Sequence, residues 1–178
     1  MNELSSRYAS GLFSLALDLS KIIEYKSQIK LLLSLLKENE EYLNVLSSQF
    51  LSIQERISLV DEAFKSIDDN ILSFIKIIIS NNRVKYLIDI FENFISLCNK
   101  HLNILEGLVY STEPLSNEEK EKLEIEFSKK LSVKVEFKNL IDTSLIGGVK
   151  VVLNNHVYDG SLKNKLFILK NSLLKGGN

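Results

Sequence analysis

Two linked stretches decide the fold: Leu145-Ile146-Gly147-Gly148-Val149, and Val157-Tyr158-Asp159-Gly160-Ser161 a few residues later. The glycines lead into an alternating apolar run from Val149 to Leu153, which is typical of a strand with one buried face. Asn154-Asn155 is a turn-forming pair, so we expect a hairpin with a short piece at His156 to Tyr158. A closing helix should follow the second stretch.

The double glycine Gly147-Gly148 has a second interpretation, a phosphate-binding loop. Such loops need several converging backbone amides and usually a lysine and a hydroxyl that open a helix. Here the pair leads into a strand and no such lysine follows. We therefore predict a turn or bulge with positive φ. A phosphate-binding enzyme that uses this turn stays an alternative hypothesis.

The rest of the C-terminal region, residues 106–178, predicts a small α/β module. Leu108 to Tyr110 and Val133 to Phe137 are expected strands. Between them, Ser116 and Glu119 have the spacing of a capping box, which predicts a charged helix to about Lys130. A module of this size often needs support from a neighbour or a partner.

Residues 1–105 predict successive helices, because apolar residues recur every three or four positions and proline is absent from this region. Ser52 with Glu55 predicts one helix start, and Asp68 or Asp69 another. Asn39 is expected to cap a third helix with its side chain. Five or six helices with short connections predict an antiparallel bundle, so the fold class is α+β. A long helix is expected from Arg83 to about His101, with the Arg83 guanidinium tying neighbouring helices together.

The first helix has a wide apolar surface. One stripe and the residues beside it comprise Leu4, Tyr8, Ala9, Leu12, Phe13, Leu15, Ala16 and Leu19. This apolar surface is wider than packing against one neighbouring helix requires. The remaining apolar surface could bind a partner helix in a groove. We therefore expect a partner-binding groove formed by Tyr8, Leu12, Phe13 and Leu15, with Ile75 and Ile79 across it. The alternative is that these residues are simply the core of the bundle.

The charge balance argues against nucleic acid as a partner. Residues 1–105 carry 11 basic and 13 acidic side chains, and residues 106–178 carry 11 and 10, so neither half has the positive excess that binds phosphate backbones. The N-terminus lacks the pattern of a secretory signal. The most apolar window, Ile71 to Ile79, contains Lys76 and is too short to cross a membrane. We expect a cytoplasmic protein without direct membrane insertion.

No catalytic set is visible in the sequence. The single cysteine, Cys98, lies in an apolar stretch and is interpreted as buried. His101 and His156 lack partners at metal-binding spacing. Acidic clusters stand at expected helix starts, where they favour the positive end of the helix dipole. We therefore expect no catalytic residues, no cofactor-binding residues, no cofactor and no metal.

The chain resembles the δ subunit of rotary F-type ATP synthase, whose mitochondrial counterpart is the oligomycin-sensitivity-conferring protein. The resemblance covers nearly the whole chain and rests on Arg7-Tyr8-Ala9 with Leu12-Phe13 and Leu15-Ala16, Asn82-Arg83 with Leu87 and Phe91, Ser111 to Leu115, Asp142 to Val149, and Asp159-Gly160-Ser161-Leu162 with Leu166. One departure is Gly11, where such proteins more often carry alanine; it loosens the first helix slightly.

This resemblance implies a six-helix N-terminal domain that binds the N-terminal segment of an ATP synthase α subunit between its first and fifth helices. It implies that residues 106–178 hold the C-terminal region of the b stalk. The chain would be a non-catalytic connector, monomeric within the complex, at the inner face of the cell membrane, that resists the torque of the rotor. A free-standing helical adaptor with the same groove stays an alternative.

Overall fold

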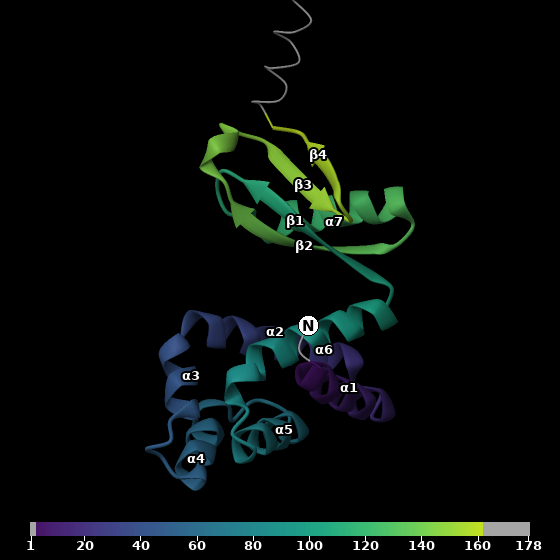
Figure 1. Ribbon diagram of the computed structural model, residues 1–178. Helices are drawn as coiled ribbons and strands as arrows, with labels where there is room; N and C mark the ends of the chain where they lie inside the picture. The colour runs from purple at the N-terminus through teal and green to yellow at the C-terminus, as the bar shows by residue number, and fades with distance from the viewer. Residues whose placement is uncertain (1–2, 162–178) are drawn as a thin grey trace, which may run out of the picture. The chain divides into compact units, whose positions relative to one another are not determined.

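The computed structural model describes residues 3–161 and divides the chain into two compact units, Met1–Cys98 and Asn99–Asn178 (Figure 1). A helical N-terminal region is followed by a small mixed sheet, which confirms the α+β class. The predicted closing helix lies outside the described residues.

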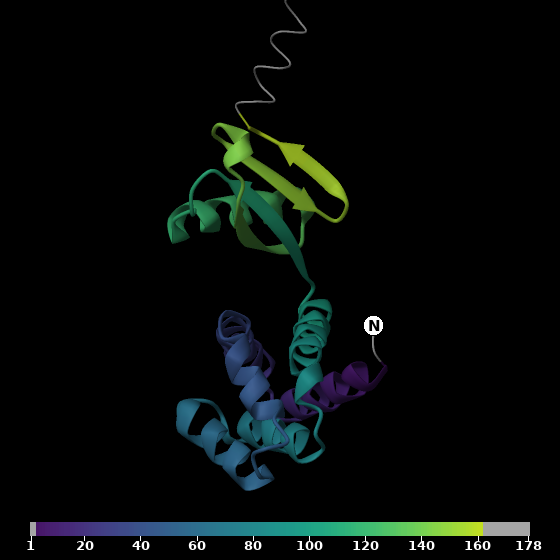
Figure 2. The ribbon, with the colours of Figure 1, turned by 60° about the vertical axis from the view of Figure 1, so that its left-hand side comes forward.

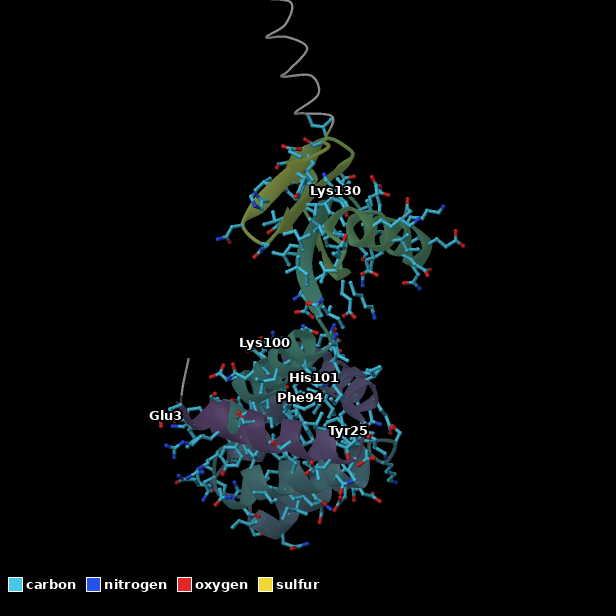
Figure 3. All side chains as sticks on the ribbon, turned by 90° about the vertical axis from the view of Figure 1, so that its right-hand side faces the viewer. Glu3, Tyr25, Phe94, Lys100, His101 and Lys130 are labelled. Atoms are coloured by element: carbon cyan, nitrogen blue, oxygen red, sulfur yellow. The ribbon has the colours of Figure 1, made fainter. Side chains whose placement is uncertain are left out.

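The helices of the first region have between 8 and 17 residues and follow one another closely along the chain. They are α1 (Glu3–Asp18), α2 (Ile22–Glu38), α3 (Glu40–Ser47), α4 (Ile53–Ala63), α5 (Asp69–Ser80) and α6 (Leu87–His101). The largest fully buried side chains include Tyr25, Phe91 and Phe94. Figure 3 shows Tyr25 and Phe94 within the helical unit, and Glu3 at its edge.

Two predicted helix starts are confirmed. Ser52 and Glu55 form a reciprocal capping box at α4, in which the Glu55 amide donates to Ser52 Oγ at 3.2 Å. Asp68 caps α5 by accepting from the Asn70 amide at 2.9 Å. Both caps satisfy amides that have no partner inside the helix.

Two local predictions are wrong. The Asn39 side chain makes no cap bond to α3; its Nδ2 donates backward to the Leu35 carbonyl at 2.8 Å, at the end of α2. The long helix predicted from Arg83 begins instead with a 3₁₀ turn, Val84–Tyr86, in which the Tyr86 amide bonds the Arg83 carbonyl at 3.0 Å. Helix ends often take this tighter form, which periodicity alone does not reveal.

The second unit contains a four-stranded sheet in the order β2-β1-β3-β4. Its strands are β1 (Ile104–Ser111), β2 (Lys134–Ile141), β3 (Val149–Leu153) and β4 (His156–Asp159). β1 and β2 are parallel, and the other neighbouring pairs are antiparallel. A parallel pair needs a crossover, and α7 (Asn117–Leu131) supplies it. β1 and β2 are longer than predicted because they pair along their full lengths.

One face of the sheet packs against α7 (Figure 1). The buried cluster on this face is Val109, Val135, Phe137, Val151 and Leu153, with Leu123 and Phe127 of α7 packed against it. The Ser116–Glu119 capping box at the start of α7 is confirmed. This face therefore carries the core of the second unit.

The turns of the second unit agree with the sequence prediction. Asn154 and Asn155 both have positive φ, 48° and 64°, and join β3 to β4 as a tight hairpin. Before β3, Gly148 has a φ of 77°, which confirms a turn that requires positive φ at the double glycine.

Candidate protein-binding groove

A groove of about 680 Å³ opens on the helical unit, between α1 and α5. Figures 1 and 2 show these two helices next to each other. The residues that line the groove are Glu3, Leu4, Arg7, Tyr8, Gly11, Phe74, Ile77 and Arg83.

Helix α1 divides its apolar surface between two neighbouring faces. The buried face consists of Ser5, Ala9, Leu12 and Ala16, at spacings of three and four. Leu4, Tyr8 and Gly11 have the same spacing one residue earlier, so they form the adjacent face, which lines the groove. The wide apolar stripe seen in the sequence therefore serves two surfaces.

Tyr8 joins three segments at the floor of the groove. Its ring packs edge-on against Phe74 of α5, with 6.1 Å between ring centroids. Arg83 Nη1 donates to the Tyr8 hydroxyl at 2.6 Å, and the guanidinium carbon lies 5.4 Å from the ring centroid. This contact confirms that Arg83 ties helices together, and it holds the Tyr8 ring in place.

Helix α5 contributes an apolar wall. Ile77 lines the groove and leaves 52% of its surface exposed. Ile75, Ile78 and Ile79 of the same helix are buried in the bundle. An isoleucine exposed in a groove beside aromatic rings is a surface that an apolar partner can cover.

Three charged residues line the groove, Glu3, Arg7 and Arg83, and Arg83 is the one without an acidic partner among the described residues. Arg7 forms an ion pair with Glu3 at 2.6 Å, and both side chains are largely exposed. Within residues 3–161, no carboxylate lies within ion-pair distance of Arg83, whose hydrogen-bond partner is the Tyr8 hydroxyl. The groove therefore combines an apolar floor with an arginine that a carboxylate of a partner can approach.

The predicted groove residues divide between groove and core. Tyr8 lines the groove. Leu12, Ile75 and Ile79 are buried inside the bundle, because they lie on the inward faces of α1 and α5. Phe13 and Leu15 are partly buried and are not among the residues that line the groove.

Sequence reasoning did not select Leu4, Gly11, Phe74 or Ile77 for the groove. Leu4 belonged to the same stripe as Tyr8, and the spacing of three and four along α1 was a usable signal for both. Helix α5 also carried a usable signal: its polar residues Asp69, Ser73, Lys76 and Ser80 recur at spacings of four and three, and Ile77 borders this polar stripe, so it was the isoleucine to expect on the outside.

The N-terminal end of α5 is fixed to α2 by a network around Asp68. Lys21 Nζ donates to Asp68 Oδ2 at 2.8 Å, and the Tyr25 hydroxyl donates to Oδ1 at 3.0 Å. The hydrogen bond from Lys21 is the main cause that lowers the pKa of Asp68 to about 2. Because α5 forms one wall of the groove, this network also sets the position of that wall.

The described residues give no support for a reactive cysteine, a metal site or a membrane-spanning helix. Burial raises the pKa of the Cys98 thiol to about 11, so the thiol stays protonated at neutral pH. In residues 3–161, no three His, Cys, Asp or Glu side chains are grouped to hold a metal ion. Over the same residues, each helix is too short or too polar to cross a membrane.

The second unit offers a different surface on its sheet. Leu108, Val152 and Val157 are neighbours across β1, β3 and β4. Side chains alternate along strands, so these three lie on the face opposite to the core residues Val109 and Val151. Val157 is 57% exposed. This row is an apolar surface suited to contact with a partner.

Comparison with known proteins gives consistent matches over nearly the full length. A family model described as ATP synthase delta (OSCP) subunit matches residues 4–173. ATP synthase subunit delta of Mycoplasma mobile is 35% identical over 169 residues, covering 94% of each chain. The Bacillus cytotoxicus protein of the same name is 32% identical over 176 residues, covering 98% of each. A chain in the cryo-EM structure of the Toxoplasma gondii mitochondrial ATP synthase hexamer shares the fold, with a TM-score of 0.68, 17% identity and coverage of 97% and 98%.

Proposed function

The chain belongs to the ATP synthase delta (OSCP) subunit family, and we propose that it connects the catalytic head of the enzyme to the peripheral b stalk. Subunits of this family are structural and non-catalytic, so the chain is not an enzyme. Its place is in the stator, where it resists the torque that the rotor exerts on the head.

We assign binding of the ATP synthase α subunit to residues 1–105, acting as one antiparallel six-helix bundle. The groove between α1 and α5 carries this proposal, because Leu4, Tyr8, Phe74 and Ile77 offer an apolar surface to one face of an amphipathic helix. The N-terminal segment of the α subunit is the proposed occupant. Tyr8 has a direct role, and Leu12, Ile75 and Ile79 support the walls from inside.

We assign binding of the C-terminal region of the b subunit to residues 106–178. The row formed by Leu108, Val152 and Val157 supports this assignment, because it is apolar and lies on the face of the sheet away from the core cluster. The two contacts together would hold a single copy of the chain at the inner face of the cell membrane, without inserting it into the bilayer. A connector under torque needs slowly dissociating contacts rather than bond-making chemistry.

A peptide titration tests the head contact. The full chain is titrated by calorimetry with a synthetic peptide of the N-terminal segment of the ATP synthase α subunit from the same organism. Ile77→Asp places a charge in the groove and should weaken binding by about tenfold or more, since about 1.4 kcal/mol corresponds to a factor of ten. Ile23→Asp is the matched control, because Ile23 is an exposed isoleucine of α2 outside the groove. Absence of binding by the folded wild type would contradict the proposal.

A capture experiment tests the stalk contact. The full chain is immobilised and exposed to the C-terminal region of the b subunit. Val157→Asp should reduce capture, whereas Val45→Asp, at an exposed valine of α3, should not. Equal capture by both variants would argue against this face of the sheet. A wild type that binds the α peptide but not the b subunit would overturn the stalk contact, whereas a folded wild type that binds neither would favour the free-standing adaptor.

A further inference from the structure

We propose that Arg56, which does not line the groove, is a positioning residue for it. Arg56 holds the side chain of Asn82, fixes the turn that follows α5, and so sets the direction in which Arg83 reaches Tyr8. The inference rests on the proposed function. It adds to that function a residue that acts on the contact with the α-subunit segment through a second residue.

The chain leaves α5 through a turn centred on Asn82. Asn82 has a φ of 53°, in the left-handed region. Its amide bonds the Ile79 carbonyl at 2.9 Å, and the Arg83 amide bonds the Ile78 carbonyl at 2.9 Å. These two bonds form a Schellman motif, in which glycine is the usual residue at the left-handed position. The turn by itself therefore does not require the side chain of an asparagine.

A buried arginine binds the Asn82 side chain. Arg56 of α4 is only 4% exposed. Its Nη1 and Nη2 both donate to Asn82 Oδ1 at 3.1 Å. Nη1 also donates to the carbonyl of Leu46, in the last turn of α3, at 3.3 Å. The guanidinium thus joins α3 and α4 to the end of α5.

Arginine is a costly residue for this buried position. Within residues 3–161, no carboxylate lies within ion-pair distance of the Arg56 guanidinium, and its Nε is buried without a hydrogen-bond partner. Burial of a charge without an opposite charge is unfavourable, and apolar residues often replace buried charged groups without loss of stability. An apolar side chain could fill the site, but it could not hold Asn82, because that requires a directional hydrogen bond.

Arg83 directly follows the restrained turn. Arg83 and Tyr8 line the groove and are joined by a hydrogen bond, whereas Arg56 and Asn82 are not among the residues that line it. The two backbone dihedral angles of Asn82 set the direction in which the chain continues into Arg83. Loosening of Asn82 should therefore displace the Arg83 guanidinium relative to α1.

The experiment removes the restraint without leaving a buried charge. In the full chain, Arg56→Met is combined with Asn82→Gly, because methionine fills irregular buried space and glycine tolerates the positive φ. Removal of both hydrogen-bonding partners together should change the melting temperature little. The affinity for the synthetic N-terminal α-subunit peptide, measured by calorimetry, should nevertheless fall about tenfold.

The matched control is Lys76→Met combined with Asp61→Asn. Lys76 and Asp61 form an ion pair at 2.6 Å that also joins α5 to α4, and neither residue lines the groove. This control should keep its affinity within about twofold of wild type. Equal losses of affinity in the two double variants would overturn the role of Arg56, because any loosening of α4 from α5 would then weaken binding.

A thermodynamic cycle with Arg83 distinguishes positioning from a general loss of stability. Arg83→Gln should lower the affinity for the peptide about tenfold in the wild type. In the variant that carries Arg56→Met and Asn82→Gly, the same change should lower it by about twofold or less, because Arg83 is already displaced there. Equal effects of Arg83→Gln in the two backgrounds would overturn the inference.

The outcomes keep the two proposals apart. A folded wild type that does not bind the peptide overturns the head contact, and with it the role of Arg56 in that contact. A wild type that binds, with the Arg56→Met and Asn82→Gly variant binding equally well, overturns the role of Arg56 alone.

Asn82→Gly alone provides the test if the double variant fails to fold. Glycine keeps the turn and removes only the acceptor for Arg56. The affinity of this single variant for the peptide should fall about threefold or more. An unchanged affinity would overturn the role of Arg56.

Discussion

The helical unit and the sheet unit differ in how many large apolar side chains they bury. The helical unit buries many large side chains, including Tyr25, Phe91 and Phe94, and still leaves an apolar groove open. In the described part of the sheet unit, residues 99–161, the buried apolar cluster has five residues, and α7 packs partly buried side chains against it. The helical unit can therefore tolerate an exposed binding surface, whereas the sheet unit depends strongly on each core residue.

The largest expected effect is from Phe137→Ala in the sheet unit. The Phe137 ring is buried and packs edge-on against Phe127, with centroids 5.4 Å apart. Its removal should destabilise by about 3–5 kcal/mol, comparable with the whole stability of a small unit. Hydrogen exchange should show loss of protection in β1 to β4 and in α7, while helices α1 to α6 stay protected. Phe94→Ala is the control and should lower protection in the helical unit; equal loss in both units would contradict their independence.

A smaller effect is expected from Gly107→Ala. The new methyl would lie too close to Leu153 and Phe137. Overpacking of this kind should destabilise the sheet unit by about 1–3 kcal/mol, measured by urea unfolding. The same substitution at Gly11 should stabilise the helical unit, so the two variants should have opposite signs. A stabilised Gly107→Ala would show that the core of the sheet unit is looser than the contacts indicate.

The capping boxes allow the same change in each unit. Ser52→Ala removes the cap of α4, and Ser116→Ala removes the cap of α7. Each should cost about 1 kcal/mol of stability. Thermal unfolding should show the larger shift in melting temperature for Ser116→Ala, because a smaller unit has a smaller unfolding entropy. A larger shift in melting temperature for Ser52→Ala than for Ser116→Ala would contradict the expectation that the smaller sheet unit is more sensitive to the loss of a cap.

The smallest effect concerns the charge on Asp68. Its pKa is lowered to about 2 in the folded state, mainly by the hydrogen bond from Lys21. The ionised form therefore stabilises the fold above the unfolded pKa of about 4, and this contribution is lost as the pH falls toward 2. The difference in unfolding free energy between wild type and Asp68→Asn should shrink over that range. Asp69→Asn, at the exposed neighbour, is the control; a difference that grows on acidification would contradict the assignment.

Local features of this chain were predictable because their causes lie within a few residues. Ser52 with Glu55, and Ser116 with Glu119, formed the caps that their spacing indicates. The Asn154-Asn155 turn formed for the same reason. Asn39 was mispredicted because an asparagine between two helices can bond either one, and the sequence does not say which carbonyl or amide is nearer.

The candidate site was only partly predictable. The wide stripe on α1 indicated a surface beyond one packing seam, and Tyr8 does line the groove. On α5, Ile77 borders the polar stripe and is exposed, whereas Ile75 is buried; that Ile77 faces α1 across the groove depends on the orientation of α5 in the bundle. That orientation is fixed by contacts from distant segments, such as Lys21 to Asp68.

The α+β class, most helix starts, the tight turns and the family resemblance could all be read from the sequence, because spacing, capping and backbone preference act over short distances. The tertiary structure alone decided which apolar residues of α1 and α5 became core and which became groove. Burial depends on which neighbours folding brings together. Two residues of the same hydrophobicity at nearby positions of one helix can therefore differ, one being buried in the core and the other exposed in the groove.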